Sequence, residues 1–243
     1  MNTSVANTYN RKKLNFTHGS GIYLFSDENK KYIDLAAGIA VNLLGHSNKK
    51  LINALHKQSK KLWHVSNLYK IEEQEQLATK LTNLSFASKV FFCNSGAEAV
   101  EGAIKTARKY AYTNINKKKN EIVSFSDAFH GRTMMTIALN GSDRFVEGFG
   151  PMPKGIKHHP YNEIKDLEKV ITKNTAAVII ELVQGEAGII KAKKDFVQKI
   201  KRLCKQNKAL IIVDEVQSGA GRTGTLFAYE QFGIKPDIMC CAK

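Results

Sequence analysis

The chain has 243 residues and a formal charge of +15, and no apolar run approaches the roughly 18–20 residues that a membrane-spanning helix needs. Hydrophobic residues make up 43% of it, enough for one large domain or for one domain and part of another. The first thirteen residues have no apolar stretch behind their charges, which argues against a secretory signal. Together these features predict a soluble, cytoplasmic protein.

The positive charge is scattered along the chain. Its densest run, Lys117 to Lys119, lies in a polar stretch without interleaved aromatic residues. A lysine-rich solvated surface explains this pattern, and it also suits anionic small-molecule ligands. A basic nucleic-acid-binding protein is the alternative from a different class, and it would be marked by steeply salt-dependent binding to RNA.

The four cysteines form no C-x-x-C pair, which makes a zinc site or a thioredoxin-type site a weak interpretation. We predict no metal site. Cys240 and Cys241 are adjacent in an apolar run, as expected for reduced cysteines in a core.

The expected elements begin with a hairpin over 21–35 that turns at 27–29, followed by amphipathic helices within 48–62 and 72–84. Strands are then expected at 90–93, 121–125, 176–182 and 209–214, and another begins within 235–243. Two further helices have apolar residues at helical spacing: Val100, Ala103, Ile104 and Ala107 in one, and Phe196, Val197, Ile200, Leu203 and Cys204 in the other. Apolar strands that alternate with helices predict an α/β fold, with a mostly parallel sheet flanked by helices.

Four stretches follow expected strands and carry small or reactive residues. They are "CNSGAEA" (93–99), "DAFHGRT" (127–133), "IIELVQGEAG" (179–188) and "IIVDEVQSGAGRTG" (211–224). Because ligands of open parallel sheets bind beyond the carboxyl ends of the strands, we expect these stretches to converge on one site.

The residue types in these stretches suit an anionic ligand with a flat ring. Ser95 and Gly96 open a helix whose free N–H groups could bind phosphate, although an ordinary N-cap is an equal alternative. Phe129 could stack on a ring or pack in a core, and Arg132 could bind a carboxylate with two bonds. His130 follows Phe129 in the same stretch, and a hydrogen-bonded loop histidine is the alternative interpretation for it.

Carboxylates end two of the expected strands. Glu181 lies inside an apolar run, and Glu186 follows it in a glycine turn. Asp214 ends another apolar run, where a buried carboxylate is costly unless a positive group meets it. The "GAGRTG" that follows is a poor dinucleotide motif, because "EVQS" separates it from the strand.

Taken in order, "GIAVNLLGH", "LWHVSNLY", "FFCNSGAEAVEGAIKTARKY", "FHGRT", "VQGEAG", "VDEVQSGAGRTG" and the final "AK" resemble the class III aminotransferases that use pyridoxal phosphate, most of all the acetylornithine type. The likeness runs from about Tyr9 to Lys243. It implies the type I fold of pyridoxal-phosphate-dependent transferases. Residues 1–45 would be a partial small domain and 46–243 an incomplete large domain, with the C-terminal domain absent.

The resemblance also implies roles for the residues that would hold the cofactor. Gly96 and Ala97 would bind its phosphate through backbone amides, with help from Ser95. Phe129 and Val216 would lie against the two faces of the pyridine ring.

The remaining roles concern the reacting groups. Gln217 would bond the phenolic oxygen, Asp214 would pair with the ring nitrogen, and Lys243 would form the Schiff base and move protons. Arg132 would bind the substrate carboxylate far from the reacting carbon. Glu186 resembles the glutamate that masks a second arginine in one half-reaction.

The implied reaction moves the terminal amino group of N2-acetyl-L-ornithine to 2-oxoglutarate, giving N-acetylglutamate 5-semialdehyde and glutamate, a step of arginine biosynthesis. A small residue at Gly38 favours the acetylated donor. Ornithine, succinylornithine, succinyldiaminopimelate and 4-aminobutyrate remain alternative donors. We expect the full-length protein to be a homodimer and these 243 residues alone to be inactive.

Overall fold

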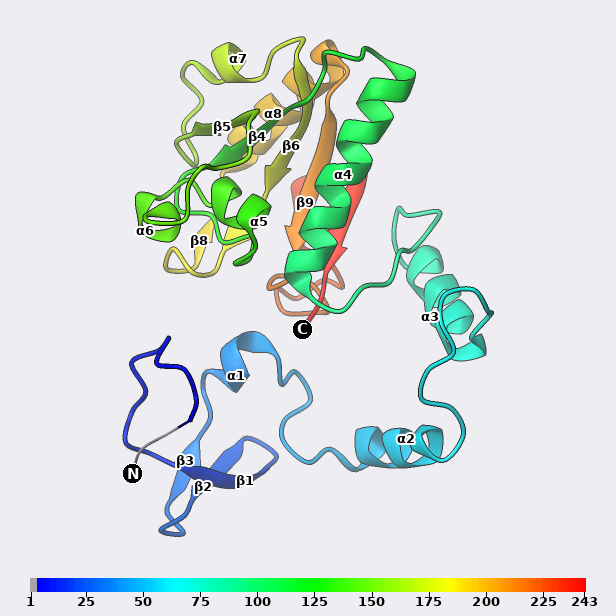
Figure 1. Ribbon diagram of the computed structural model, residues 1–243, viewed down its shortest axis with the longest axis vertical. Coiled ribbons are helices and arrows are strands. Elements are labelled where there is room, and N and C mark those ends of the chain that lie inside the picture. Colours follow the sequence, from blue (N-terminus) through cyan, green and yellow to red (C-terminus); the bar gives the residue numbers. More distant parts are fainter. Residues whose placement is uncertain (1–3) are drawn as a thin grey trace. The chain divides into compact units, whose positions relative to one another are not determined.

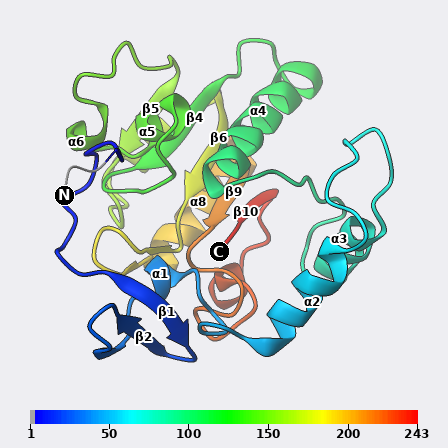
Figure 2. The same ribbon diagram turned by 60° about the horizontal axis from the view of Figure 1, so that its bottom comes forward.

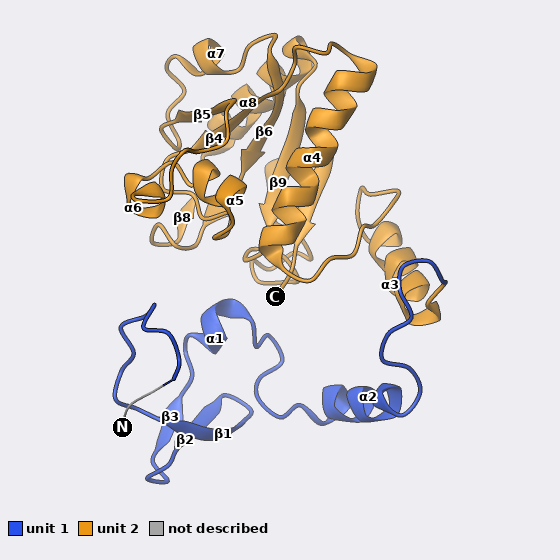
Figure 3. Cartoon of the chain, viewed as in Figure 1, with its two compact units in different colours: residues 1–69 blue, residues 70–243 orange. Residues whose placement is uncertain are grey.

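The computed structural model describes residues 4–243, so the first three residues of the expected N-terminal segment lie outside it. Two compact units divide the described chain, one up to Tyr69 and one from Lys70 (Figure 3). The division into 1–45 and 46–243 stays a prediction. No helix among the described residues has both the length and the apolar character needed to cross a membrane.

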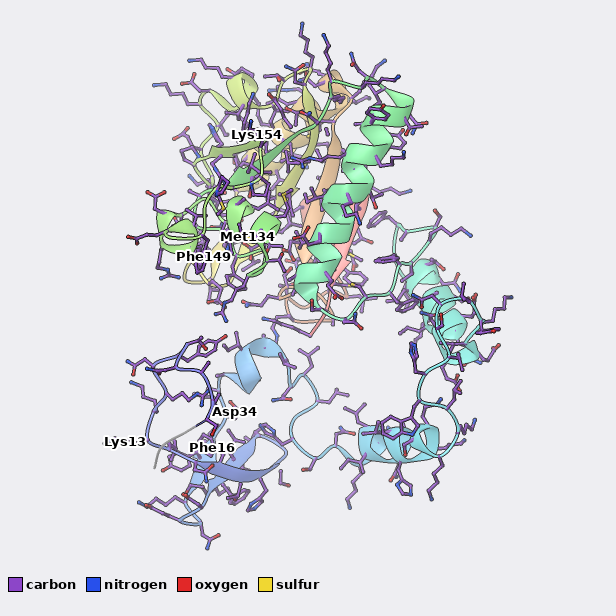
Figure 4. All side chains as sticks on the ribbon, in the orientation of Figure 1. Lys13, Phe16, Asp34, Met134, Phe149 and Lys154 are labelled. Atoms are coloured by element: carbon purple, nitrogen blue, oxygen red, sulfur yellow. The ribbon has the colours of Figure 1, made fainter. Side chains whose placement is uncertain are left out.

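The first unit contains a small antiparallel sheet and two helices. The hairpin expected over 21–35 is confirmed, because β2 and β3 pair antiparallel with Tyr23 opposite Ile33. Its elements are β1 (Phe16–Ser20), β2 (Tyr23–Ser26), β3 (Lys31–Ile33), α1 (Ala37–Ala40) and α2 (Lys49–Ser59). Asp34, marked in Figure 4, follows β3 and bonds His46 Nε2 at 2.8 Å, which ties the end of the sheet to the turn before α2.

The second unit is built around a five-stranded parallel sheet in the order β10-β9-β6-β4-β5 (Figure 1). Its strands are β4 (Glu121–Phe125), β5 (Ile156–His159), β6 (Thr175–Ile180), β9 (Leu210–Glu215) and β10 (Ile238–Cys241). The helices are α3 (Glu72–Asn83), α4 (Gly96–Asn114), α5 (Met134–Leu139), α6 (Asp143–Val146), α7 (Leu167–Val170) and α8 (Lys194–Asn207), with a 3₁₀ turn at Ala228–Phe232 and a short β7–β8 ribbon (Val183–Gln184, Ile190–Lys191).

Helices cover both faces of this sheet, as the continuous apolar strands predict. Successive strand residues point to opposite faces, so Val178 and Ile180 of β6 pack with α8, whereas Ile179 packs with α4. All nine apolar positions predicted to line the two helices are buried. Each fully buried aliphatic side chain contributes roughly 1.5–3 kcal/mol of transfer free energy.

Two local predictions are wrong. The strand expected at 90–93 has no ladder, because no other described strand lies beside it. This segment and β10 both line a groove of about 820 Å³ instead. Cys241 is exposed rather than in the core, because β10 is an edge strand and only Cys240 faces the packed side.

Candidate active site at the carboxyl edge of the sheet

The four stretches singled out in the sequence converge at the carboxyl edge of the parallel sheet, the end nearest the C-terminus in Figure 1 and turned toward the viewer in Figure 2. A Cβ added to Gly96 would lie 2.8 Å from Val216 Cγ1, and one added to Gly131 would lie 2.8 Å from Ala97 Cβ. Three loops therefore meet in direct contact, and only residues without a side chain allow that approach. The fourth stretch joins them through Gly185, which lies against the side chain of Gln217.

The N-terminus of α4 is one wall of this edge. Ser95 caps it, because its hydroxyl oxygen accepts a bond from Glu98 N at 3.1 Å. The amides of Gly96 and Ala97 lie in the first turn, where intrahelical partners are missing and the helix dipole favours an anion. Nineteen residues of helix follow, so this is a well-formed N-terminus.

The loop after β4 places Phe129, His130 and Arg132 at the same edge. The Phe129 ring is half-buried and meets the Phe145 ring edge-on, with centroids 6.0 Å apart. The guanidinium of exposed Arg132 lies 5.8 Å from the Phe129 centroid. Met134, labelled in Figure 4, begins α5 directly after this loop.

Asp214 occupies the end of β9 and is 4% exposed. Its Oδ2 lies 2.7 Å from His130 Nδ1, and its Oδ1 accepts a bond from Val216 N at 3.0 Å. The chain itself therefore supplies a partner for the buried carboxylate. Sequence reasoning missed this pair, since the two residues are 84 positions apart and His130 reads equally well as a loop histidine.

Glu181 directly follows β6 and is 7% exposed. Its Oε2 accepts the backbone N–H of Phe129 at 2.9 Å. Burial raises the pKa of this carboxyl to about 7, against the opposing effect of the His130 charge. Glu186, five residues later in the turn between β7 and β8, is exposed.

Glu215, next to Asp214, organises the loop that follows β9. It is fully buried, and its carboxylate accepts bonds from Ser218 Oγ, Ala228 N and Tyr229 N at 2.8, 3.0 and 2.8 Å. This loop contains Val216 and Gln217, so Glu215 holds the segment that carries two of the predicted cofactor contacts. Sequence reasoning missed it as well, because a glutamate after a strand gives no sign of which amides it caps.

Lys243 lies at the same carboxyl edge as Asp214. Strands β9 and β10 are parallel neighbours, with Asp214 opposite Cys240, and Lys243 follows Cys240 by three residues. The lysine is exposed. Among residues 4–243 no group of histidine, cysteine and acidic side chains could hold a metal ion.

The whole described chain, residues 4–243, matches the model of the family "Aminotransferase class-III". The chain belongs to the class III aminotransferases. This confirms the predicted family, and with the five-stranded sheet it confirms the predicted fold class. Class III aminotransferases use pyridoxal phosphate, so membership also supports the predicted cofactor.

The relatives of this class III chain include the acetylornithine aminotransferase of Agrobacterium fabrum, which is 50% identical over 97% of the chain and 59% of its own length. The acetylornithine/succinyldiaminopimelate aminotransferase of Buchnera aphidicola is 48% identical over 93% of the chain and 55% of its own length. Among solved structures, the N-acetylornithine aminotransferase of Stenotrophomonas maltophilia matches with a TM-score of 0.83 and 37% identity, over 97% of this chain and 59% of that one. The chain thus spans about three-fifths of the length of these relatives.

Proposed function

We propose that the longer protein containing this class III chain is an acetylornithine transaminase, which uses pyridoxal phosphate to move the terminal amino group of N2-acetyl-L-ornithine to 2-oxoglutarate. The single observation that carries the proposal is the carboxylate of Asp214, which is buried and held in place at the sheet edge by His130 and the amide of Val216. The acetylated donor rests on relatives named for it at 44–50% identity.

The residues at this edge fit the cofactor. Gly96 has no side chain, which lets Val216 lie directly against the start of α4, and this helix N-terminus favours an anion, so the amides of Gly96 and Ala97 would hold the phosphate. Phe129 and Val216 would contact the ring, and Gln217 would bond its phenolic oxygen. Lys243 would hold the aldehyde carbon through its amine.

When bound, pyridoxal phosphate supplies an electron sink for negative charge on the substrate carbon. Asp214 would favour the protonated form of the ring nitrogen, because an opposite charge in a dry site stabilises the cation. Lys243 would carry the proton between the substrate carbon and the cofactor carbon with its Nζ. Arg132 would bind the distant carboxylate of the substrate, and Glu186 would cover a second arginine in one half-reaction.

The finer choice of donor is less constrained by the chain. Gly38 has a φ of 63°, which by itself favours glycine, so its small size is weaker support for an acetyl group. The name of the Buchnera relative keeps succinyldiaminopimelate as a second candidate donor.

We also propose that the longer protein is a cytoplasmic homodimer. The first unit supports this, because large apolar side chains such as Leu35, Trp63 and Leu68 are 86–92% exposed. Exposed large apolar side chains are frequent where one protein surface contacts another.

A substrate panel tests the proposed reaction. We would express the protein with all of the sequence that accompanies residues 1–243 in its gene, load it with pyridoxal phosphate, and measure glutamate formed from 2-oxoglutarate. We expect the specificity constant for N-acetylornithine to exceed that for ornithine and 4-aminobutyrate by about tenfold or more, a difference of about 1.4 kcal/mol in transition-state binding. Equal rates with all three donors, or a preference for ornithine, would contradict the acetylornithine assignment.

A further inference from the structure

Glu181 is a buried acid that none of the roles above uses. Its carboxylate sits at the end of β6, 7% exposed, with Oε2 on the backbone N–H of Phe129. Tyr161 donates its hydroxyl to the backbone oxygen of the same residue at 2.8 Å, which fixes the strand end. Burying an ionised acid costs free energy unless its charge is paired and hydrogen-bonded.

The bond to Phe129 fixes the backbone of the loop that carries the ring-facing side chain. A second buried side chain, Asn140, holds the next residues: its Oδ1 accepts His130 N at 2.8 Å, and its Nδ2 donates to Gly131 O at 3.2 Å. Residues 129–131 are therefore held from two elements, at the end of β6 and at the end of α5.

Glu181 interacts electrostatically with His130, and His130 in turn bonds Asp214, the residue proposed to pair with the ring nitrogen. Three ionisable groups from different elements face that histidine: Asp214 at the end of β9, Glu181 after β6, and His158 on β5. Burial alone lowers the pKa of His130, but its bond to Asp214 and the negative charges of Asp214 and Glu181 leave the pKa above its ordinary value. The charge of His130 in turn lowers the pKa of His158, which is already depressed by burial. Glu186 adds negative charge near Glu181.

We propose that Glu181 is a positioning residue of this site: its side chain anchors the backbone of Phe129, the residue next to His130, and when ionised it places a second negative charge near the His130–Asp214 pair. Its value for catalysis rests on the proposed function, since it acts through Phe129 and Asp214. A protonated His130 fixes Asp214 in its ionised form and in one orientation, with the other oxygen on Val216 N. The hydrogen bond to Phe129, which we call the tether, and the negative charge of Glu181 can be removed separately, so each is tested by its own variant.

The test is an NMR titration of the longer protein without added cofactor, with ¹⁵N-labelled histidine, in which the His130 resonance is assigned by its loss in His130→Gln. In Glu181→Gln the amide oxygen can still accept the Phe129 N–H while the charge is gone. We expect the pKa of His130 to fall by about one pH unit, roughly a tenfold loss of proton affinity, which is the scale for removing a nearby charge in a buried site. Exchange of the Phe129 amide hydrogen should stay within about threefold of wild type.

Glu181→Leu removes both functions. We expect the same fall in the pKa of His130 and, in addition, at least about tenfold faster exchange of the Phe129 amide hydrogen. The matched control is Glu163→Gln, which alters an exposed glutamate that also accepts one backbone N–H, from Lys165 at 2.8 Å. It should leave both readings unchanged.

A His130 pKa that is the same in wild type and Glu181→Gln would overturn the electrostatic part, and unchanged Phe129 exchange in Glu181→Leu would overturn the tether. If Glu181→Leu does not fold, Glu181→Gln still tests the electrostatic effect on His130. Glu181→Asp then replaces Glu181→Leu in the test of the hydrogen bond to Phe129, because its shorter side chain withdraws the acceptor. All readings are taken without cofactor, so a protein that fails to bind pyridoxal phosphate would sink the proposed function and leave this result standing.

Discussion

Replacing Asp214 with asparagine is expected to lower the turnover of the longer protein by about a hundredfold to a thousandfold, the scale for removing one preorganised electrostatic group from a water-excluded site. Asparagine has nearly the same shape, and its oxygen can still accept the Val216 N–H. It cannot supply the negative charge that would favour a protonated ring nitrogen. The loss should appear in kcat as well as in kcat/KM, because the charge acts on the reacting state.

Asp237→Asn is the matched control for this prediction. Asp237 is also an aspartate bound to β9, where its Oδ2 accepts Ile211 N at 2.8 Å, but it lies near the beginning of the strand. The control should cost some stability and leave kcat within a few-fold of wild type. An Asp214→Asn enzyme with turnover equal to that of the control would contradict the role assigned to Asp214.

Replacing Glu215 with alanine is expected to destabilise the chain by about 3–5 kcal/mol, because several buried donors are left unsatisfied at roughly 1–3 kcal/mol each. Three donors, Ser218 Oγ and the amides of Ala228 and Tyr229, lose their acceptor in a place that water does not reach. Urea unfolding followed by circular dichroism measures the change through the midpoint at constant slope.

Glu230→Ala is the control for the Glu215 variant. Glu230 is exposed and accepts a single backbone bond, from Phe227 N at 2.8 Å, in the same 3₁₀ turn. It should cost about 1 kcal/mol, as is usual for one exposed capping bond. Equal losses in the two variants would show that Glu215 does not organise the loop as its three bonds indicate.

The parallel sheet could be predicted because its central strands are continuous apolar runs between amphipathic helices. The expected strand at 121–125 has the bounds of β4, and those expected at 176–182 and 209–214 differ from β6 and β9 by at most two residues at either end. The expected strand at 90–93 failed for a physical reason: a strand exists only through its neighbour, and the described chain places no strand beside it. A local stretch of sequence shows the apolar pattern of a strand, but it does not show whether a partner strand lies beside it.

The candidate site could likewise be predicted from the sequence only in part. Residues that end strands, such as Asp214, could be placed at one edge because all parallel strands end there. Contacts across the site could not: the bond from His130 to Asp214 and that from Phe129 to Glu181 join residues 84 and 52 positions apart. Such pairs depend on the register between strands and on loop geometry, which no local pattern encodes. The catalytic and binding roles of the site residues stay predictions.

The central claim is that Asp214 and Lys243, at the carboxyl ends of neighbouring strands, hold the same ring. Its most direct test is to load the longer protein with pyridoxal phosphate, reduce it with sodium borohydride, and locate the added mass by peptide mass spectrometry. We expect the cofactor on Lys243, at about one per chain, with the label lost in Lys243→Arg and its retention weakened in Asp214→Asn. Stoichiometric label on any other lysine, or retention unaffected by Asp214→Asn, would contradict the account.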